Sequence, residues 1–458
     1  MTNVIVEVSK FLMMILFALY TFECFAAFRG KISDKKRERI FKRQIFFLYL
    51  IHLDGYLSIY AVTDEIQIVI LYFLEVVLIT VLLGNYQLLY PNASRLVTNN
   101  MCMLLVVGFI MLTRLSYEKA VRQYIFAIVS AIIIFVVPVL IRKAKFLRKL
   151  TWLYAVVGIA GLAVVTVFGN TSYGAKISIT IGPVTLQPSE FVKLIFVFFV
   201  ACMLHYNTEF KQVCITTVVA AIHVLILVAS RDLGGALIFF ITYLVMLYVA
   251  TRKLFYFAGG ILVGCIAAVV AYQLFSHVRV RVLAWSDPLS VIDNEGYQIC
   301  QSLFAIGTGG WFGTGLYQGS PNKIPVVEQD FIFSAISEEM GGIFALCLIM
   351  VCVSCFLMFL NIAMQMKDQF YKLVALGLGT VYAFQVFLTI GGVTKFIPST
   401  GVTLPLVSYG GSSLVSTMIL FAVIQGLYIL RQDEGETNGK QNTKRRTTKF
   451  DEEIEDFS

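Results

Sequence analysis

Long apolar runs, separated by short polar segments, follow one another along almost the whole chain. About thirteen runs of roughly 20 residues can be marked: near 6–27, 44–62, 66–89, 97–114, 122–141, 151–169, 189–206, 213–230, 235–251, 254–276, 332–360, 371–391 and 412–431. A helix of this length crosses a bilayer and satisfies its own backbone hydrogen bonds there. No segment shows the regular alternation that a membrane β-barrel requires. The pattern predicts an all-α polytopic membrane protein.

The composition supports this prediction. Of 458 residues, 58% are hydrophobic and 14% are charged, whereas a soluble domain averages about a quarter charged. The first run lacks a basic leader and a small-residue cleavage site, so we expect it to be a retained span. Nine cysteines without a CxxC motif and four scattered histidines indicate neither a disulfide framework nor a metal site.

The basic residues lie in short loops, which orients the helices. The net charge of +8 therefore reflects the positive-inside bias and predicts contact with membrane lipid and no nucleic-acid partner. The densest basic segment, 29–43, should be cytoplasmic. Alternation then places on the same side a set of further segments: 142–149, 251–253, 366–372 and the tail. The loops 63–65, 170–188, 277–331 and 392–411 fall outside, as does the N-terminus, and the C-terminus is cytoplasmic. The polar tail, 432–458, should be disordered.

Two of the outer loops carry candidate chemistry. In the large extracytoplasmic loop 277–331, Ile299, Leu303 and Ile306 share one face, which predicts a short interfacial amphipathic helix; a flexible interfacial loop is the alternative. The loop "KFIPSTGVTLPLVSYGGSS" (395–413) contains prolines, paired glycines and hydroxyls, including those of Ser408 and Ser412. Irregular backbone near membrane depth must be buried in protein or line a wet cavity. We expect either a re-entrant turn or a wall of a polar cleft.

The stretch "PVVEQDFIFSAISEE" (325–339) places acidic residues at the start of an apolar run. Asp330 at a helix start would cap free amide groups, which is a purely structural role. On a helix, however, Asp330, Ser334, Ser337 and Glu338 share one face. Such a stripe should face a cavity, because lipid penalises it, and an intramembrane carboxylate is a functional candidate.

Further ionisable groups gather on the predicted outer side: Glu190, Lys193, Arg231, Asp232, Arg279, Arg281, Lys323 and Lys395. Any single one is typical of an interfacial anchor or half of an ion pair. Taken together, they predict a cationic cleft with one exposed carboxylate. Such a cleft suits an anionic, phosphate-bearing lipid substrate.

These segments resemble the SEDS family, the RodA, FtsW and SpoVE proteins of bacteria. The stretches that carry the resemblance are "QPSEFVKL", "RDLGGA", "RVLAWSDP", "GYQICQSLFAIGTGGWFGTGLYQG", "DFIFSAISEEMG" and "STGVTLPLVSYGGSS". It implies a ten-helix SEDS-like core over 96–431, preceded by about three extra transmembrane helices in 1–95. It also implies a peptidoglycan glycosyltransferase that polymerises lipid II, the undecaprenyl-pyrophosphate-linked disaccharide peptide, at the outer face of the bacterial cytoplasmic membrane. The usual partner is a class B penicillin-binding protein, a transpeptidase.

The resemblance also assigns roles to residues. The family's proposed catalytic aspartate opens the "DFIF" motif and corresponds to Asp330, which would act as general base in an inverting glycosyl transfer. Cations would stabilise the pyrophosphate leaving group. The expected substrate-binding residues are Lys193, Glu190, Arg279, Arg281, Lys323, Lys395, Ser334, Glu338, Ser408 and Ser412. No cofactor is certain, and a divalent cation, Mg²⁺ or Mn²⁺, is left open.

Two other functions fit a polar site within such a bundle. A flippase for lipid-linked precursors would need a hydrophilic path that reaches the cytoplasmic side, whereas these motifs gather on the outer side. A non-catalytic scaffold of the elongation, division or sporulation machinery would need no catalytic carboxylate. The leading prediction is the transferase.

Overall fold

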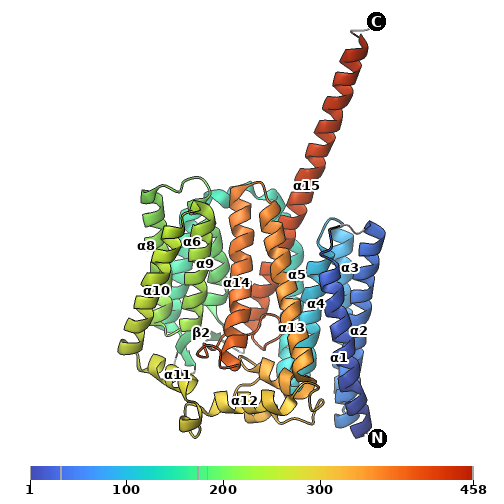
Figure 1. The fold of residues 1–458 in the computed structure, drawn as a ribbon, viewed down its shortest axis with the longest axis vertical. Coiled ribbons are helices and arrows are strands. Elements are labelled where there is room, and N and C mark those ends of the chain that lie inside the picture. Colours follow the sequence, from blue (N-terminus) through green and yellow to red (C-terminus); the bar gives the residue numbers. More distant parts are fainter. Residues whose placement is uncertain (1, 31–32, 173–174, 183, 456–458) are drawn as a thin grey trace.

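Helices run back and forth between two ends of a bundle in the computed structural model, which describes residues 2–30, 33–172, 175–182 and 184–455 (Figure 1). The first three are α1 (Thr2–Ala26), α2 (Asp34–Thr63) and α3 (Ile66–Leu89). The long helices that follow are α4 (Arg95–Leu115), α5 (Tyr117–Lys143), α6 (Thr151–Phe168), α7 (Pro188–Leu204), α8 (Phe210–Ala229), α9 (Leu233–Thr251), α10 (Leu254–Leu274), α13 (Ile332–Gln365), α14 (Gln369–Val393) and α15 (Gly411–Glu455).

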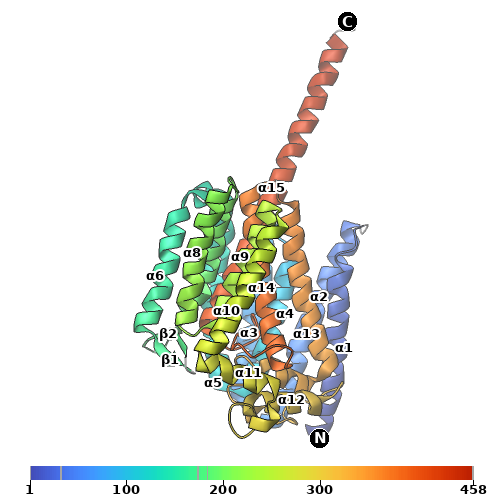
Figure 2. The same ribbon diagram turned by 60° about the vertical axis from the view of Figure 1, so that its left-hand side comes forward.

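Shorter elements connect them. The helices are η1 (Lys145–Lys149), α11 (Ser276–Ser286), η2 (Leu289–Val291), α12 (Tyr297–Gly309) and η3 (Pro321–Lys323). The strands are β1 (Asn170–Ser172), β2 (Ala175–Ile181) and β3 (Val184–Leu186), which form an antiparallel sheet in the order β1-β2-β3. α11 and α12 lie across one end of the bundle (Figure 2). The short amphipathic helix predicted around Ile299 is confirmed as α12.

The helix lengths confirm a polytopic, all-α membrane protein. Within the described residues, twelve helices are long and apolar enough to cross a membrane. α7 has 17 residues and is about 25 Å long, and its neighbours connect to it at opposite ends. The N-terminus lies at the end that carries α11 and α12, and the C-terminus lies at the other (Figure 1). The basic connections 142–149, 251–253 and 366–372 lie at the C-terminal end of the bundle, as the alternation predicts.

The tail differs from its prediction. α15 continues as a helix to Glu455, although the polar composition of 432–458 predicts disorder; residues 456–458 lie outside the described part. The apolar half of α15 is already helical. Extending an existing helix adds one hydrogen bond for each residue fixed and avoids the cost of nucleation.

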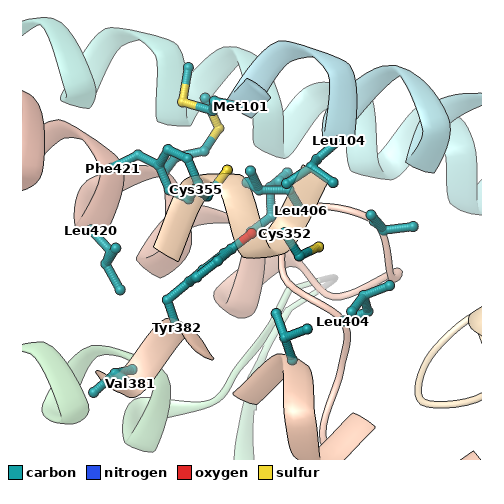
Figure 3. Close-up of a cluster of buried hydrophobic side chains, with 14 of the residues drawn as sticks. Met101, Leu104, Cys352, Cys355, Val381, Tyr382, Leu404, Leu406, Leu420 and Phe421 are labelled. Atoms are coloured by element: carbon teal, nitrogen blue, oxygen red, sulfur yellow. The ribbon is translucent and has the colours of Figure 1, made fainter. Parts of the chain in front are cut away.

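Among the candidate membrane spans in the described residues, α4 is the most buried and α10 the least. Every residue of α4 from Leu96 to Arg114 is buried, whereas no residue of α10 is. A cluster of buried apolar side chains forms where α4, α13, α14 and α15 meet (Figure 3). There Tyr382 packs edge-on against Phe421 and Phe359, with ring centroids 5.5 and 5.4 Å away. Aromatic contacts of this kind hold these helices together.

The first three helices pack directly against the rest of the bundle. The Phe17 ring of α1 lies 4.3 Å from the Phe344 ring of α13. Tyr20 donates to Oδ1 of Asn100 at 2.9 Å, and Asn100 Nδ2 donates to Ser354 Oγ at 3.1 Å. This buried polar chain links α1, α4 and α13. Interhelical hydrogen bonds hold helices together where lipid offers no hydrophobic drive for association.

The glycine-rich segment after α12 docks on a kink in α13. Gly341 has φ 90° inside α13, and Gly313, with φ 76°, faces it so closely that a Cβ on either would overlap the other's backbone. Buried Arg114 of α4 forms a bidentate pair with Glu339, whose side chain is fully buried. Glu339 also accepts from the backbone N–H of Tyr317 at 3.1 Å. These contacts hold the segment that leads toward Asp330.

Replacing Arg114 by leucine should destabilise the protein strongly. The change leaves the Glu339 carboxylate buried without its partner, which costs about 3–5 kcal/mol for such pairs. We expect a large fall in the thermal unfolding midpoint in detergent. The control is Arg122→Leu on α5, whose pair with Glu118 is exposed and worth about 0–1 kcal/mol. Equal shifts in both variants would show that the buried pair has no special weight.

Gly108 of α4 is needed for a close helix-to-loop contact. A Cβ there would lie 2.8 Å from the carbonyl oxygen of Val407 and 2.9 Å from that of Leu406, and both are backbone atoms that cannot rotate away. Gly108→Val should lower the unfolding midpoint, with a cost of about 1–3 kcal/mol for overpacking. Gly84→Val on α3, where the added Cβ meets nothing within 4 Å, should leave the midpoint nearly unchanged.

Candidate active site

A cavity of about 320 Å³ is lined by residues of α11, α12 and neighbouring segments at the same end of the bundle. Its walls come from the first turns of α7 and α9, the turn between α8 and α9, α11, the start of α12 and the turn before α13. The remaining wall is part of the segment 399–409, which runs between α14 and α15 and is called the strap below. A polar cleft, as predicted, is therefore present at this end of the bundle.

Asp330 lines this cavity. It lies in a turn, and the N-cap position of α13 is occupied by Phe331, so the cap role considered for Asp330 is wrong. Burial raises the pKa of the Asp330 carboxyl to about 6. Its own backbone N–H and the Arg281 guanidinium oppose that rise, and the Glu328 carboxylate adds to it. A carboxylate with such a pKa is ionised at neutral pH and still basic enough to accept a proton.

The charges around the cavity are mixed. Its lining includes three cations, Lys193, Arg231 and Arg281, and four carboxylates, Glu190, Asp232, Glu295 and Asp330. The prediction of a cationic cleft with one carboxylate is therefore wrong. The sequence reveals which charges share the outer side, but not that the acidic residues of three further segments face the same space.

Arg281 is the cation most closely associated with Asp330. Burial lowers the pKa of the Arg281 guanidinium, and the Asp232 and Asp330 carboxylates counteract this. Its Nη1 donates to the carbonyl oxygen of Ser399 in the strap at 3.3 Å. The guanidinium is therefore held at the cavity wall, where it can reach an anionic group that enters.

Lys193 is tied into the wall by its neighbours. Its ammonium donates to Glu190 Oε2 at 2.6 Å and to Gln385 Oε1 at 2.8 Å. Gln385 Nε2 in turn donates to the carbonyl oxygen of Thr403 in the strap at 3.0 Å, and Ser416 Oγ donates to Glu190. This network joins α7, α14, α15 and the strap. Both predicted residues of the "QPSEFVKL" motif thus reach the cavity.

Asp232 lines the cavity and is a functional candidate that is absent from the expected substrate-binding residues. It caps α9 by accepting from the backbone N–H of Gly235 at 2.8 Å, and Ser189 Oγ donates to its other oxygen at 3.4 Å. Burial raises the pKa of its carboxyl. The signal for it was the "RDLGGA" stretch. Glu295, by contrast, lies in a polar loop where nothing in the pattern distinguishes it from its neighbours.

Apart from Asp330, the residues of the polar stripe predicted along α13 do not line the cavity. Ser334 pairs with Ser302 of α12 at 2.6 Å, and Ser337 donates to the carbonyl oxygen of Phe333 within its own helix. Glu338 accepts from the backbone N–H of Ser320 at 2.9 Å. The prediction fails because α12 and the glycine-rich segment cover this face, where Ser302 bonds to Ser334 and the backbone of Ser320 bonds to Glu338.

Three predicted cations also lie away from the cavity lining. Arg279 is exposed and donates to the carbonyl oxygen of Gln273; it stands two residues from Arg281 on α11, and such neighbours face different sides of a helix. Lys323 is exposed on η3. Lys395 lies in a turn with φ 59°, where its carbonyl oxygen accepts from Trp285 Nε1 at 3.1 Å.

The two serines predicted in the last loop have supporting contacts and do not line the cavity. Ser408 is buried, donates to the carbonyl oxygen of Gln329 and accepts from the backbone N–H of Leu404. Ser412, at the start of α15, accepts from the backbone N–H of Gln187 at 2.9 Å. Both hydroxyls hold irregular backbone in place around the site.

No group of three His, Cys, Asp or Glu side chains among the described residues is arranged to hold a metal ion. Mg²⁺ commonly uses one or two carboxylates together with substrate phosphates. The carboxylates of this cavity fit that kind of site only if the substrate supplies the remaining ligands.

Comparisons with known proteins agree with this geometry. The pattern of the FtsW, RodA and SpoVE family, described as cell cycle proteins, matches residues 93–432. The peptidoglycan glycosyltransferase RodA of Mycobacterium bovis is 33% identical over 347 residues, which is 69% of this chain and 74% of that protein. Stage V sporulation protein E of Bacillus subtilis is 33% identical over 324 residues, which is 67% of this chain and 86% of that protein.

Solved structures share the fold. A chain of a peptidoglycan synthase complex that coordinates polymerization and crosslinking matches with a TM-score of 0.63 and 23% identity, covering 74% of this chain and 98% of that one. The rod shape determining protein RodA of Thermus thermophilus matches with a TM-score of 0.55 and 21% identity, covering 73% and 96%. With the family pattern matched over most of its length, this chain belongs to the FtsW, RodA and SpoVE family.

Proposed function

We propose that this multi-pass membrane protein is a peptidoglycan glycosyltransferase that polymerises lipid II into glycan strands, with Asp330 as its general base. Curated relatives at 33% identity carry the name peptidoglycan glycosyltransferase. The observation that carries the role of Asp330 is its place in the cavity, where its pKa is about 6 and the Arg281 guanidinium lines the same space.

The proposed step is an inverting glycosyl transfer. Asp330 takes the proton from a sugar hydroxyl of the acceptor, whose oxygen then bonds to the anomeric carbon of the donor. The bond from that carbon to the pyrophosphate oxygen breaks, and polyprenyl pyrophosphate leaves with the electron pair. Arg281 is placed to stabilise the growing phosphate charge, and Arg231 lines the same cavity. Lys193 supports the cavity wall and contributes less to phosphate stabilisation, because its ammonium is already paired with the Glu190 carboxylate.

The shape of the cavity favours transfer over flipping. Its lining on α7 reaches from Ser189 to Lys193, and on α9 from Gly235 to Phe239, which are the first turns of both helices. Beyond this lining, the bundle contains fully buried apolar side chains such as Met246 of α9 and Leu378 of α14. A flippase would need polar lining along the whole helix, and the scaffold alternative makes no use of the cavity.

We also propose a class B penicillin-binding protein as partner and lipid II as substrate. The support is the similarity to a chain from a complex that coordinates polymerization and crosslinking. A transpeptidase bound to this protein would receive glycan strands at the end of the bundle that carries the cavity. That end is the predicted outer side.

Asp330→Ala and Asp330→Asn should abolish glycan synthesis. Loss of a positioned general base costs about 10²–10⁴-fold in rate. The measurement is the formation of glycan ladders from lipid II by purified protein, with and without a penicillin-binding protein, in Mg²⁺, Mn²⁺ or EDTA. Asp293→Asn, which changes an exposed carboxylate at the same end of the bundle, is the control. Persistent product from Asp330→Ala removes Asp330 from the mechanism, and no product from wild type in any pairing favours a flippase or scaffold.

The rate should fall as the pH is lowered through about 6. A general base works only when ionised, and the pKa of Asp330 is raised to about 6, so activity is full above that value. One pH unit below it, only about a tenth of the carboxyl groups are ionised, and kcat/KM, which reports the free enzyme, should be about tenfold lower. The check is the pH dependence of kcat/KM between pH 4.5 and 8. A flat profile across that range would rule out a base with this pKa.

A further inference from the structure

The turn that carries Asp330 is held from outside the cavity by one side of α5. Gln123 of α5 is buried; its Nε2 donates to the carbonyl oxygen of Ser408, and its Oε1 accepts from the backbone N–H of Gly410. One helical turn earlier, Lys119 forms an ion pair with Glu328. Residues four apart lie on the same helix face. α5 therefore forms polar contacts with both the end of the strap and the turn before α13.

The strap and the turn are also joined directly. The backbone N–H of Tyr409 donates to the carbonyl oxygen of Glu328 at 2.8 Å, and Ser408 Oγ donates to that of Gln329. The Lys119 ammonium lies 5.9 Å from the centre of the Tyr409 ring. Lys119 thus contacts the strap and the turn at the point where they meet. Cation–π contact adds to the ion pair.

The local backbone needs such support. Val326 has φ 56° and Leu406 has φ 66°, and a β-branched residue in the left-handed region is strained. The backbone N–H of Gln329 donates to the carbonyl oxygen of Val326 at 3.0 Å, which closes a tight turn just before Asp330. Strained conformations of this kind persist only where surrounding contacts fix them.

Glu328 places a second carboxylate two residues from Asp330. Its side chain is 11% exposed, and that of Lys119 is 37% exposed. A nearby like charge raises the pKa of a carboxyl, and Glu328 acts on Asp330 in this direction. The ammonium of Lys119 offsets that charge.

We propose that Lys119 is a positioning residue for Asp330: its ion pair with Glu328 fixes the turn before α13 and cancels the charge of the neighbouring carboxylate. Asp330 then remains an ionised base at neutral pH. The proposal concerns the proposed active site and so rests on the proposed function. Lys119 itself touches neither the cavity nor a reacting atom.

Other charged groups around Asp330 must be considered in the test. Those that face it from packed elements or from its own segment are Arg281 on α11, Arg231 and Asp232 between α8 and α9, Glu190 and Lys193 on α7, Glu295 before α12, and Glu328. They are unchanged in every variant below, apart from Glu328. Differences between the variants therefore report the Lys119–Glu328 pair.

The first readout needs no activity. Carbodiimides react with protonated carboxyl groups, so the pH dependence of labelling at Asp330, located by tandem mass spectrometry of purified full-length protein, follows its protonation. Lys119→Met should raise the labelling midpoint by on the order of one pH unit, because two unpaired carboxylates release their last proton at higher pH. Glu328→Gln should lower it. The double variant Lys119→Met with Glu328→Gln should return the labelling midpoint to near its wild-type value. Lys119→Arg alone should keep the labelling midpoint near wild type.

The second readout is the acid limb of kcat for lipid II polymerisation, which should move in the same directions. Arg122→Met, one turn along α5 with an exposed partner, is the control and should move neither readout. A merely structural role of Lys119 would lower kcat at every pH without moving the limb. Coincident labelling midpoints in all variants, or a double variant that behaves like Lys119→Met, would overturn the proposal.

The two proposals fail separately. Glycan ladders from wild type together with unshifted labelling would leave the transferase standing and remove Lys119 from its site. Shifted labelling without glycan from wild type would support the charge coupling and reject the polymerase function.

Discussion

Irregular backbone inside an apolar bundle must find its hydrogen-bond partners within the protein, and the strap is the segment on which this requirement falls. Its carbonyl groups accept from side chains of the helices around it: Gln385 donates to Thr403, Thr389 to Val402 and Gln123 to Ser408. The site depends on these bonds, because the strap forms one wall of the cavity and holds the turn before α13. A site built on a loop is positioned by the rigid helices that satisfy that loop.

The charge arrangement of the cavity gives the site its chemistry. An excess of cations would hold a pyrophosphate tightly but would also keep Asp330 a weak base. With carboxylates interspersed, Arg281 is shared between Asp232 and Asp330, and burial leaves Asp330 more basic than an exposed aspartate. Two carboxylates and a guanidinium in one pocket can therefore separate proton acceptance from phosphate binding, which a uniformly positive cleft would not do.

Long apolar runs were sufficient to place the helices and their order, because most of them are separated by polar or charged segments. Residue type and position in the chain also singled out Asp330, which lines the cavity. The stripe of Ser334 and Glu338 was misassigned because spacing shows which residues share a face, but not what packs on that face. Arg114 with Glu339 and Lys119 with Glu328 join residues more than 200 positions apart. Such pairs are set by tertiary packing and leave no local signal in the chain.

The difference between α4 and α10 has an evolutionary consequence. Every side chain of α4 from Leu96 to Arg114 meets protein, so each substitution there must fit a particular shape. None of the side chains of α10 is buried, so a lipid bilayer requires little of them beyond hydrophobicity. Substitutions among homologues should therefore accumulate quickly along α10 and slowly along α4. Along α10, substitutions at one position should depend little on the residues at neighbouring positions.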